Sequence, residues 1–68
     1  MAEPKLGARL KDVRLRAGLT QAELAERVSV SRKTINTVEN GVFVPSTLLA
    51  LKLAQALKVK VEDLFFLD

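Results

Sequence analysis

Polar side chains follow one another at helical spacing between residues 32 and 37: Arg32, Lys33, Asn36 and Thr37. Residues three and four positions apart are neighbours on a helix surface, so these side chains share one outward face. Arginine and lysine can donate hydrogen bonds to guanine O6 and N7, and an asparagine amide suits the edge of adenine. These residue types therefore match the chemistry of reading base edges in DNA.

Other kinds of chemistry have little support in the sequence. The chain contains no cysteine and no histidine, so it has no thiolate metal site, no disulfide and no histidine base. No arrangement of a nucleophile with a base, or of metal ligands, stands out. We therefore expect a protein that is not an enzyme and that uses no cofactor and no metal.

The composition indicates one small folded domain over residues 1–68. Hydrophobic residues make up 49% of the chain and charged residues 28%, which is typical of a globular protein. The net charge of +3 and the pI near 9.7 favour an acidic partner, nucleic acid first. No apolar run is long enough for a membrane span or a signal core, so a cytoplasmic, nucleoid-associated location without membrane contact is expected.

The polar face requires short helices to position it. Apolar spacing predicts a first helix from Lys5 to Ala17. Thr20 and Glu23 form a capping box that opens the second helix, and Ser29 and Val30 make the following turn. Three more helices are expected over residues 32–40, 46–57 and 61–66, with no strand. The sequence thus predicts a compact, all-α domain of five helices.

Two short helices joined by a three-residue turn, inside a small basic domain, form a helix-turn-helix. The second of them, here residues 32–40, is the recognition helix that enters the major groove. The chain resembles the Cro/repressor-type helix-turn-helix regulators, the Xre family. The resemblance covers Leu10 to Phe65 and is carried by LKDVRLRAGLTQAELAERVSVSRKTINTVENG, PSTLLALKLAQAL and VEDLF.

The resemblance implies a role for each matching position. Base contacts fall to Arg32, Lys33, Asn36 and Thr37, and phosphate contacts to Gln21, Thr34 and Asn40. Arg14 and Glu39 are expected to form a structural ion pair. Two positions depart from the family pattern, because Ser29 and Lys58 stand where glycine is common and would need left-handed backbone.

The C-terminal end predicts a dimer. Phe65 and Phe66 are adjacent, and neighbouring residues of a helix cannot both face the core. We therefore expect residues 61–68 to contribute a dimer interface through Leu64, Phe66 and Leu67, with possible help from Leu48 or Leu51. The function favoured is a homodimeric transcriptional regulator, in the first instance a repressor, bound to an inverted-repeat operator in double-stranded DNA.

Two alternatives stay open at this point. The chain could be a protein-interaction module, such as an antitoxin or an adaptor, that uses the helix-turn-helix only as a scaffold, because a fold does not prove a function. It could also be the DNA-binding part of a longer regulator.

Overall fold

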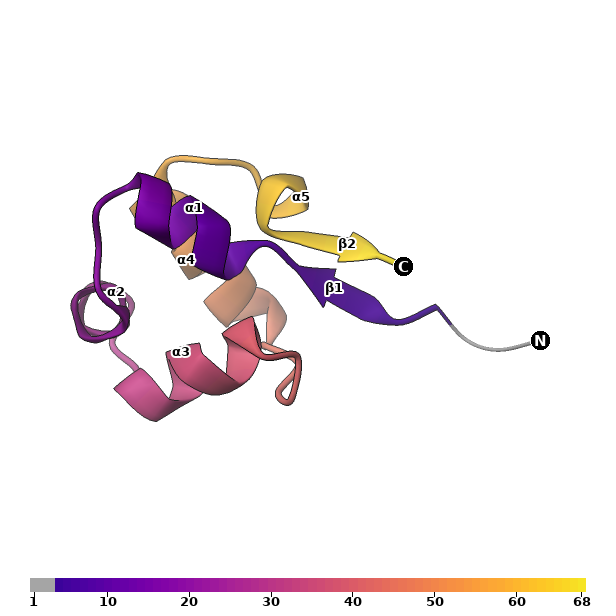
Figure 1. Ribbon diagram of the computed structural model, residues 1–68, viewed down its shortest axis with the longest axis horizontal. Helices are drawn as coiled ribbons and strands as arrows, with labels where there is room; N and C mark the ends of the chain where they lie inside the picture. Colours follow the sequence, from indigo (N-terminus) through magenta and orange to yellow (C-terminus); the bar gives the residue numbers. More distant parts are fainter. Residues whose placement is uncertain (1–3) are drawn as a thin grey trace.

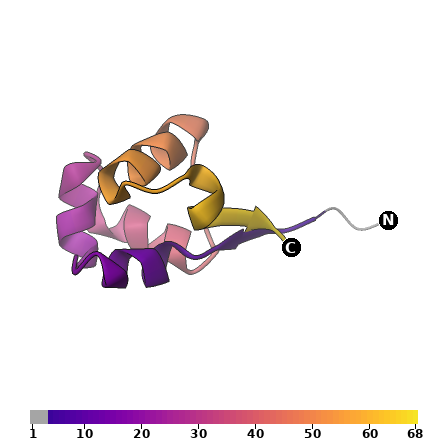
Figure 2. The same ribbon diagram turned by 90° about the horizontal axis from the view of Figure 1, so that it is seen from above.

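A computed structural model describes residues 4–68 as a small helical bundle with a two-stranded ribbon at one end (Figure 1). The helices are α1 (Leu10–Arg16), α2 (Gln21–Arg27), α3 (Arg32–Glu39), α4 (Thr47–Leu57) and α5 (Val61–Leu64). The strands are β1 (Leu6–Ala8) and β2 (Phe65–Leu67), and they lie at the end of the molecule opposite α2 (Figures 1 and 2). The prediction of a mainly helical, five-helix domain is confirmed.

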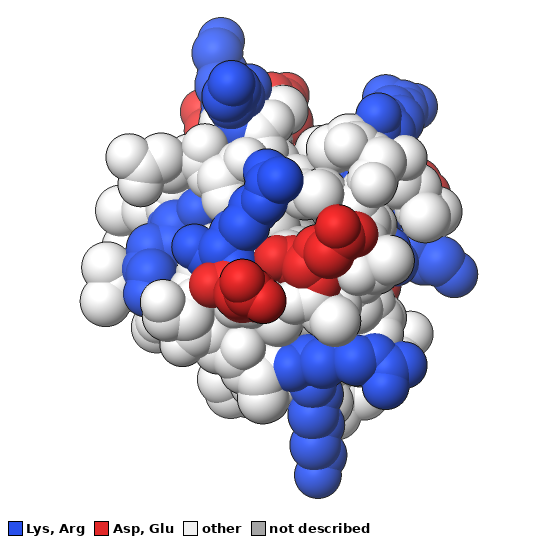
Figure 3. All heavy atoms as spheres, turned by 90° about the vertical axis from the view of Figure 1, so that its left-hand side faces the viewer, with Lys and Arg blue, Asp and Glu red and all other residues white. Residues whose placement is uncertain are grey.

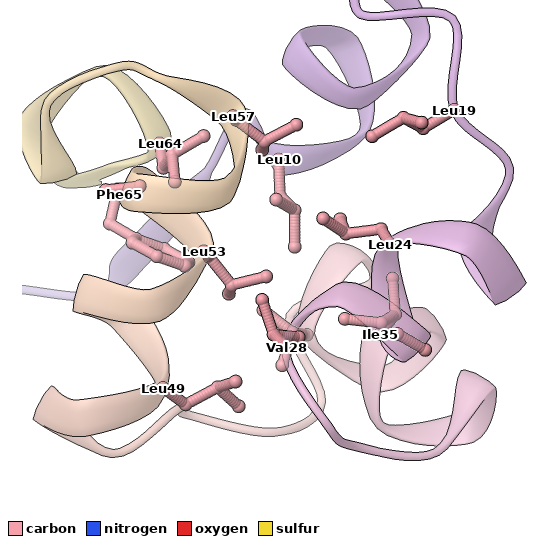
Figure 4. Packing of buried hydrophobic residues seen from close by; sticks show 13 residues of the cluster. Leu10, Leu19, Leu24, Val28, Ile35, Leu49, Leu53, Leu57, Leu64 and Phe65 are labelled. Atoms are coloured by element: carbon pink, nitrogen blue, oxygen red, sulfur yellow. The ribbon is translucent and has the colours of Figure 1, made fainter.

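One hydrophobic cluster holds the helices together (Figure 4). Each of the five helices contributes at least one side chain that is fully buried, namely Leu10, Leu24, Ile35, Leu53 and Leu64. Val28 and Val38 are almost as deeply buried beside them. Because helices this short are unstable alone, their packing around this cluster supplies most of their stability.

Side-chain caps fix where three of the helices begin. Thr20 and Glu23 form the predicted capping box at the start of α2, with hydrogen bonds of 3.0 and 2.9 Å. The Thr20 backbone N–H, followed by the Thr20 hydroxyl, lowers the pKa of the Glu23 carboxyl. Ser31 and Ser46 accept hydrogen bonds from backbone amides in the first turns of α3 and α4. These caps confirm the three predicted helix starts.

The two chain ends depart from the prediction, because they pair as an antiparallel β-ribbon made of β1 and β2. The first helix begins at Leu10 rather than Lys5, and the last ends at Leu64 rather than Phe66. Leu6 lies opposite Leu67 in the ribbon, and further backbone hydrogen bonds extend the pairing on both sides. The expectation that the chain contains no strand was therefore wrong.

Gly7 and the two adjacent phenylalanines explain the ribbon. Successive side chains of a strand point to opposite faces, so Phe65 enters the core while Phe66 lies on the other face. There the Phe66 ring covers Gly7, where an added Cβ would lie only 2.2 Å from Cζ of the ring. The Arg9 guanidinium lies 4.1 Å from the centroid of the same ring. A strand thus accommodates two neighbouring aromatics that a helix could not.

Within residues 4–68, two non-glycine residues adopt left-handed backbone, as the departures from the family pattern predict. Ser29 has a φ of 59° in the turn between α2 and α3, and Lys58 has a φ of 58° after α4. The Val30 N–H donates to the Ala25 carbonyl across the turn, which closes the end of α2 in the manner of a Schellman motif. The turn therefore keeps the geometry that glycine commonly provides, at a local cost of about 1 kcal/mol.

A buried polar network joins α1 and α2 to the Glu39 carboxylate of α3. Arg14 Nε donates to Glu39 Oε2 at 2.6 Å, and Gln21 Nε2 donates to Glu39 Oε1 at 2.9 Å. Arg14 also donates to the Leu19 carbonyl at 2.8 Å. The expected ion pair is present, and it is almost entirely shielded from solvent, because the side chains of Arg14 and Glu39 are only 7% and 2% exposed. It ties the end of α3 to α1 and to the start of α2.

The contact between Gly7 and Phe66 gives a first prediction. Gly7→Ala should displace the Phe66 ring and destabilise the ribbon, at a cost of about 1–3 kcal/mol for an overpacked site. A thermal melt should show a lower Tm, by about 4–8 °C for each kcal/mol in a chain of this size.

The cause can be isolated in a double-mutant cycle with Phe66→Ala. In the Phe66→Ala background the clash is absent, so adding Gly7→Ala should then cost little. An equal loss of Tm in both backgrounds would show that the ring is not the reason for glycine at this position.

The buried network gives a second prediction. Glu39→Ala leaves Arg14 buried without its partner, which costs about 3–5 kcal/mol and should lower Tm by about 10 °C or more. Glu26→Ala, which removes the same charge from an exposed position on α2, is the matched control and should change Tm little. A Glu39→Ala protein that melts with the wild type would contradict the structural role.

Candidate DNA-binding surface

Helix α3 divides into a buried side and an outward side. Ile35 and Val38 point into the core and are 0% and 1% exposed. Arg32 and Lys33 are exposed, while Asn36 and Thr37 are partly exposed. The structure therefore brings the four predicted base-contact residues onto one face of one helix, and it fixes that helix from behind.

The smaller polar residues of α3 also bond to one another. The Asn40 amide donates to Asn36 Oδ1, so part of the Asn36 amide is already engaged in the free protein. The Thr37 hydroxyl donates to the Thr34 carbonyl at 2.9 Å, and the Thr34 hydroxyl lies 3.0 Å from the Ser31 hydroxyl. Arg32 and Lys33 are thus the side chains most free to reach outward, whereas the Asn36 oxygen already accepts one hydrogen bond and the Asn36 amide N–H groups stay available to a base.

The charge of α3 is positive on its outward side. Its one acidic residue, Glu39, is buried against Arg14, so no carboxylate on this helix offsets Arg32 and Lys33. Figure 3 shows the end of the molecule formed by α2, where acidic side chains gather near the centre. Lysine and arginine project from the edges of that face, including the lower edge on the side of α3. An anionic partner would therefore meet positive charge at α3.

Gln21 lies at the junction of α2 and α3. Its side-chain amide is partly exposed and donates one hydrogen bond to Glu39. An amide nitrogen carries two N–H groups, so a second donor is available for an outside acceptor such as a phosphate. The geometry thus allows Gln21 to brace α3 and to contact DNA at the same time.

The predicted dimer residues do not form one surface. Leu64 is 0% exposed and belongs to the core, so its assignment to an interface was wrong. It was misplaced because the helix was expected to continue through Phe66, which would have turned these residues differently. Phe66 is half-buried between Gly7 and Arg9 of its own chain, and only Leu67, at 72% exposed, is freely accessible. Gly7 and Arg9 were not predicted to pack against Phe66, because a helix was expected where the β-ribbon forms.

Residues 4–68 offer neither a cluster of metal-binding side chains nor a membrane-spanning helix. No group of three or more acidic, histidine or cysteine residues in this range could hold a metal ion. No helix in the described part of the chain is long and apolar enough to cross a membrane.

Comparison with known proteins places this geometry in a family. The helix-turn-helix family model matches residues 10–64. Two relatives are named as uncharacterised HTH-type transcriptional regulators, one being YgzD of Bacillus subtilis and the other a protein of Methanothermobacter thermautotrophicus. YgzD is 45% identical over 88% of this chain and 91% of its own length. The M. thermautotrophicus protein is 48% identical over 87% of both chains.

A solved structure shares the fold as well. The restriction-modification controller protein C.AhdI from Aeromonas hydrophila superposes with a TM-score of 0.77, at 34% identity over 81% of this chain and 80% of the other. The family model covers most of the residues that form the buried cluster, the Arg14–Glu39 pair and the outward face of α3. The chain therefore belongs to the Cro/repressor-type helix-turn-helix family of DNA-binding transcriptional regulators.

Proposed function

We propose that the protein is a sequence-specific repressor that binds an inverted-repeat operator as a homodimer. The observation that carries this proposal is the division of α3, whose buried side is locked by the core and by Glu39 while its outward side is polar and basic. A helix held in this way can enter the major groove without unfolding its supports. Such a regulator would act at the nucleoid.

The proposal gives each polar residue on the outward face of α3 a role. Arg32 and Lys33 reach the guanine edge, while Asn36 pairs with adenine through its amide N–H groups and the second lone pair of its oxygen. Thr37 is the least free of the base-contact residues, because its hydroxyl already donates to the backbone. Gln21, Thr34 and Asn40 border this face and contact phosphates, which fixes the position of α3 in the groove.

Operator geometry supports two copies. One recognition helix reads only a few base pairs, too few for a tight and specific complex. A two-fold dimer doubles the contacts when its recognition helices lie about 34 Å apart, one turn of DNA. Each α3 then lies about 17 Å from the two-fold axis, a distance that fits within a domain whose extents are 39 × 21 × 20 Å. Repression needs only that the bound dimer obstruct the promoter.

A polar, basic recognition face argues against a pure scaffold function. A helix-turn-helix used only to hold a protein partner has no need of Arg32, Lys33 and Asn36 on one exposed side. An adaptor surface is more often apolar at its centre, with charged residues depleted. DNA is therefore the partner that fits α3.

Base reading gives a third prediction. Selection from random duplexes should return an inverted repeat for the wild type. Arg32→Ala, Lys33→Ala or Asn36→Ala should keep the Tm but flatten the base preference at one position of each half-site, by about 1–3 kcal/mol per good bidentate contact. Lys11→Ala, which removes one charge from an exposed position on α1, should leave the preference unchanged. Identical preferences in the wild type and all three α3 variants would refute the assignment.

Gln21 gives a fourth prediction. Gln21→Ala should weaken binding to all duplexes alike, because a phosphate contact carries no base information. The salt dependence should stay unchanged, because the amide is neutral and displaces no counterion. The assay should count only folded protein, since the substitution also removes a hydrogen bond to Glu39. Gln55→Ala, at an exposed position on α4, is the matched control and should leave the affinity unchanged. A change in base preference for Gln21→Ala would rule out a phosphate role.

A further inference from the structure

Asn40 and Gly41 form an asparagine–glycine pair at the end of the recognition helix. Such a pair can react with itself, because the Gly41 backbone nitrogen can attack the carbonyl carbon of the Asn40 side chain. Glycine favours this attack, since it has no Cβ to crowd its nitrogen. The chain has one other asparagine, Asn36, and a β-branched threonine follows it. Asn40 is therefore the asparagine that the sequence makes reactive.

The reaction needs water as its only co-reactant. The Gly41 nitrogen forms a bond to Asn40 Cγ, the bond from Cγ to Nδ2 breaks, and the Gly41 amide proton leaves with Nδ2 as ammonia. Water then opens the cyclic imide at either of its carbonyls. One opening gives aspartate, and the other gives isoaspartate, in which the main chain runs through the former side chain and is longer by one carbon. Both products carry a carboxylate where the amide stood.

The folded chain holds the pair in an unreactive shape. The Asn40 amide donates to Asn36 Oδ1, and the Gly41 N–H donates to the Val38 carbonyl at 3.2 Å. The ψ of Asn40 is 3°, which turns the Gly41 nitrogen toward the backbone nitrogen of Asn40 and away from its side chain. The reaction therefore requires the last turn of α3 to open.

The last turn of α3 can open without exposing the core. Asn40 and Gly41 are exposed, and the loop that follows them projects from the end of α3 (Figure 1). Val42 and Val44 in that loop are 77% and 67% exposed, so opening uncovers little apolar surface. A segment with few buried contacts opens at a free energy well below that of global unfolding. A Cβ built on Gly41 would meet no atom within 4 Å, so the imide ring has room to form.

We propose that Asn40 is a site of spontaneous deamidation, and that the reaction converts the DNA-binding protein into a form with much lower affinity for DNA. The inference rests on the proposed function, since Asn40 is one of its phosphate contacts. The new carboxylate faces DNA phosphates from the end of α3, where the helix carbonyls are already negative. Isoaspartate also displaces the loop, whose Val42 N–H donates to the Thr37 carbonyl at 2.9 Å.

Bound DNA should protect Asn40 from the reaction. A phosphate contact holds the Asn40 amide and ties down the last turn of α3, so opening that turn then also breaks a contact with DNA. Deamidation therefore proceeds in copies that are free of DNA and is slow in copies that occupy an operator. The pair limits how long a free copy stays able to bind.

Peptide mass spectrometry after incubation at mildly alkaline pH tests the reaction. The native chain should gain the mass of an amide-to-acid change at Asn40, as aspartate and isoaspartate, and keep Asn36 intact. The chain in denaturant should react faster, and native protein bound to an inverted-repeat duplex should react slowest. Asn36→Ala removes the acceptor that holds the Asn40 amide, so it should speed the native reaction several-fold and leave the denatured rate unchanged.

Each arm of this experiment has an outcome that contradicts the proposal. Native protein that keeps Asn40 intact over many half-lives of the denatured chain would overturn the site, as would equal rates at Asn36 and Asn40. A native rate that Asn36→Ala leaves unchanged would overturn the restraint by the hydrogen bond. An unchanged rate in protein that is bound to DNA would overturn the protection.

Two amide-to-acid substitutions measure the consequence for DNA binding. Asn40→Asp should weaken binding to all duplexes roughly tenfold or more, because a donor to phosphate is replaced by a like charge. Gln55→Glu makes the same change at an exposed position on α4, and this matched control should bind nearly as the wild type does. Circular dichroism should show both variants folded, because both side chains are exposed.

Ageing links the reaction to the loss of affinity. Wild-type protein should lose DNA affinity in step with the conversion of Asn40. Asn40→Gln keeps an amide but needs a larger ring to react, so it should keep its starting affinity over the same time. Equal losses in the wild type and Asn40→Gln would show that another change inactivates the protein.

The two assays separate this inference from the proposed function. If Asn40 converts and fresh wild-type protein binds no DNA, the modification site stands and the DNA-binding function fails. If fresh wild-type protein binds DNA and Asn40→Asp binds as tightly as Gln55→Glu, the function stands and the proposed effect of deamidation is wrong.

Discussion

The Glu39 carboxylate is the point on which the position of the recognition helix depends. It closes α3, accepts hydrogen bonds from Arg14 of α1 and Gln21 of α2, and is only 2% exposed. A carboxylate without water is costly unless donors surround it, so these segments must stay together wherever Glu39 stays buried. An eight-residue helix would not persist alone. The buried carboxylate and the apolar contacts of Ile35 thus let α3 present a polar face as a rigid surface.

Closure of the chain ends is a second constraint on so small a domain. No disulfide is available, and the core alone gives a short chain limited stability. The β-ribbon joins residues near both ends, and Arg9 covers the ring that Gly7 makes room for. Pairing of the ends also places Phe65 in the core. The ribbon therefore completes the bundle.

The sequence predicted the parts of the fold that depend on local signals. Thr20, Ser31 and Ser46 mark the starts of α2, α3 and α4, and the spacing of Ile35 and Val38 indicates which side of α3 is outward. The ribbon depends on a contact between Gly7 and Phe66, which are far apart in the chain. No local pattern reveals such a contact, so the apolar spacing that predicted a helix from Lys5 was misleading.

The candidate site, like the fold, was predictable where the signal is local and not where it depends on residues far apart in the chain. The polar face of α3 is visible in residues 32–37 because it repeats at helical spacing. The partner of Arg14 lies 25 positions away and was expected from family resemblance, since no rule of spacing links the two. Leu64 was misassigned because its burial depends on where α5 ends, which the β-ribbon decides.

The salt dependence of binding to a mixed-sequence duplex tests the central claim most directly, namely that the basic face of α3 binds DNA. Contacts from Arg32 and Lys33 of two copies displace counterions, so the logarithm of the association constant should fall linearly with that of the salt concentration. We expect the affinity to drop about a hundredfold between roughly 50 and 200 mM salt. Absence of binding at low salt, or an affinity that does not change with salt, would contradict the account.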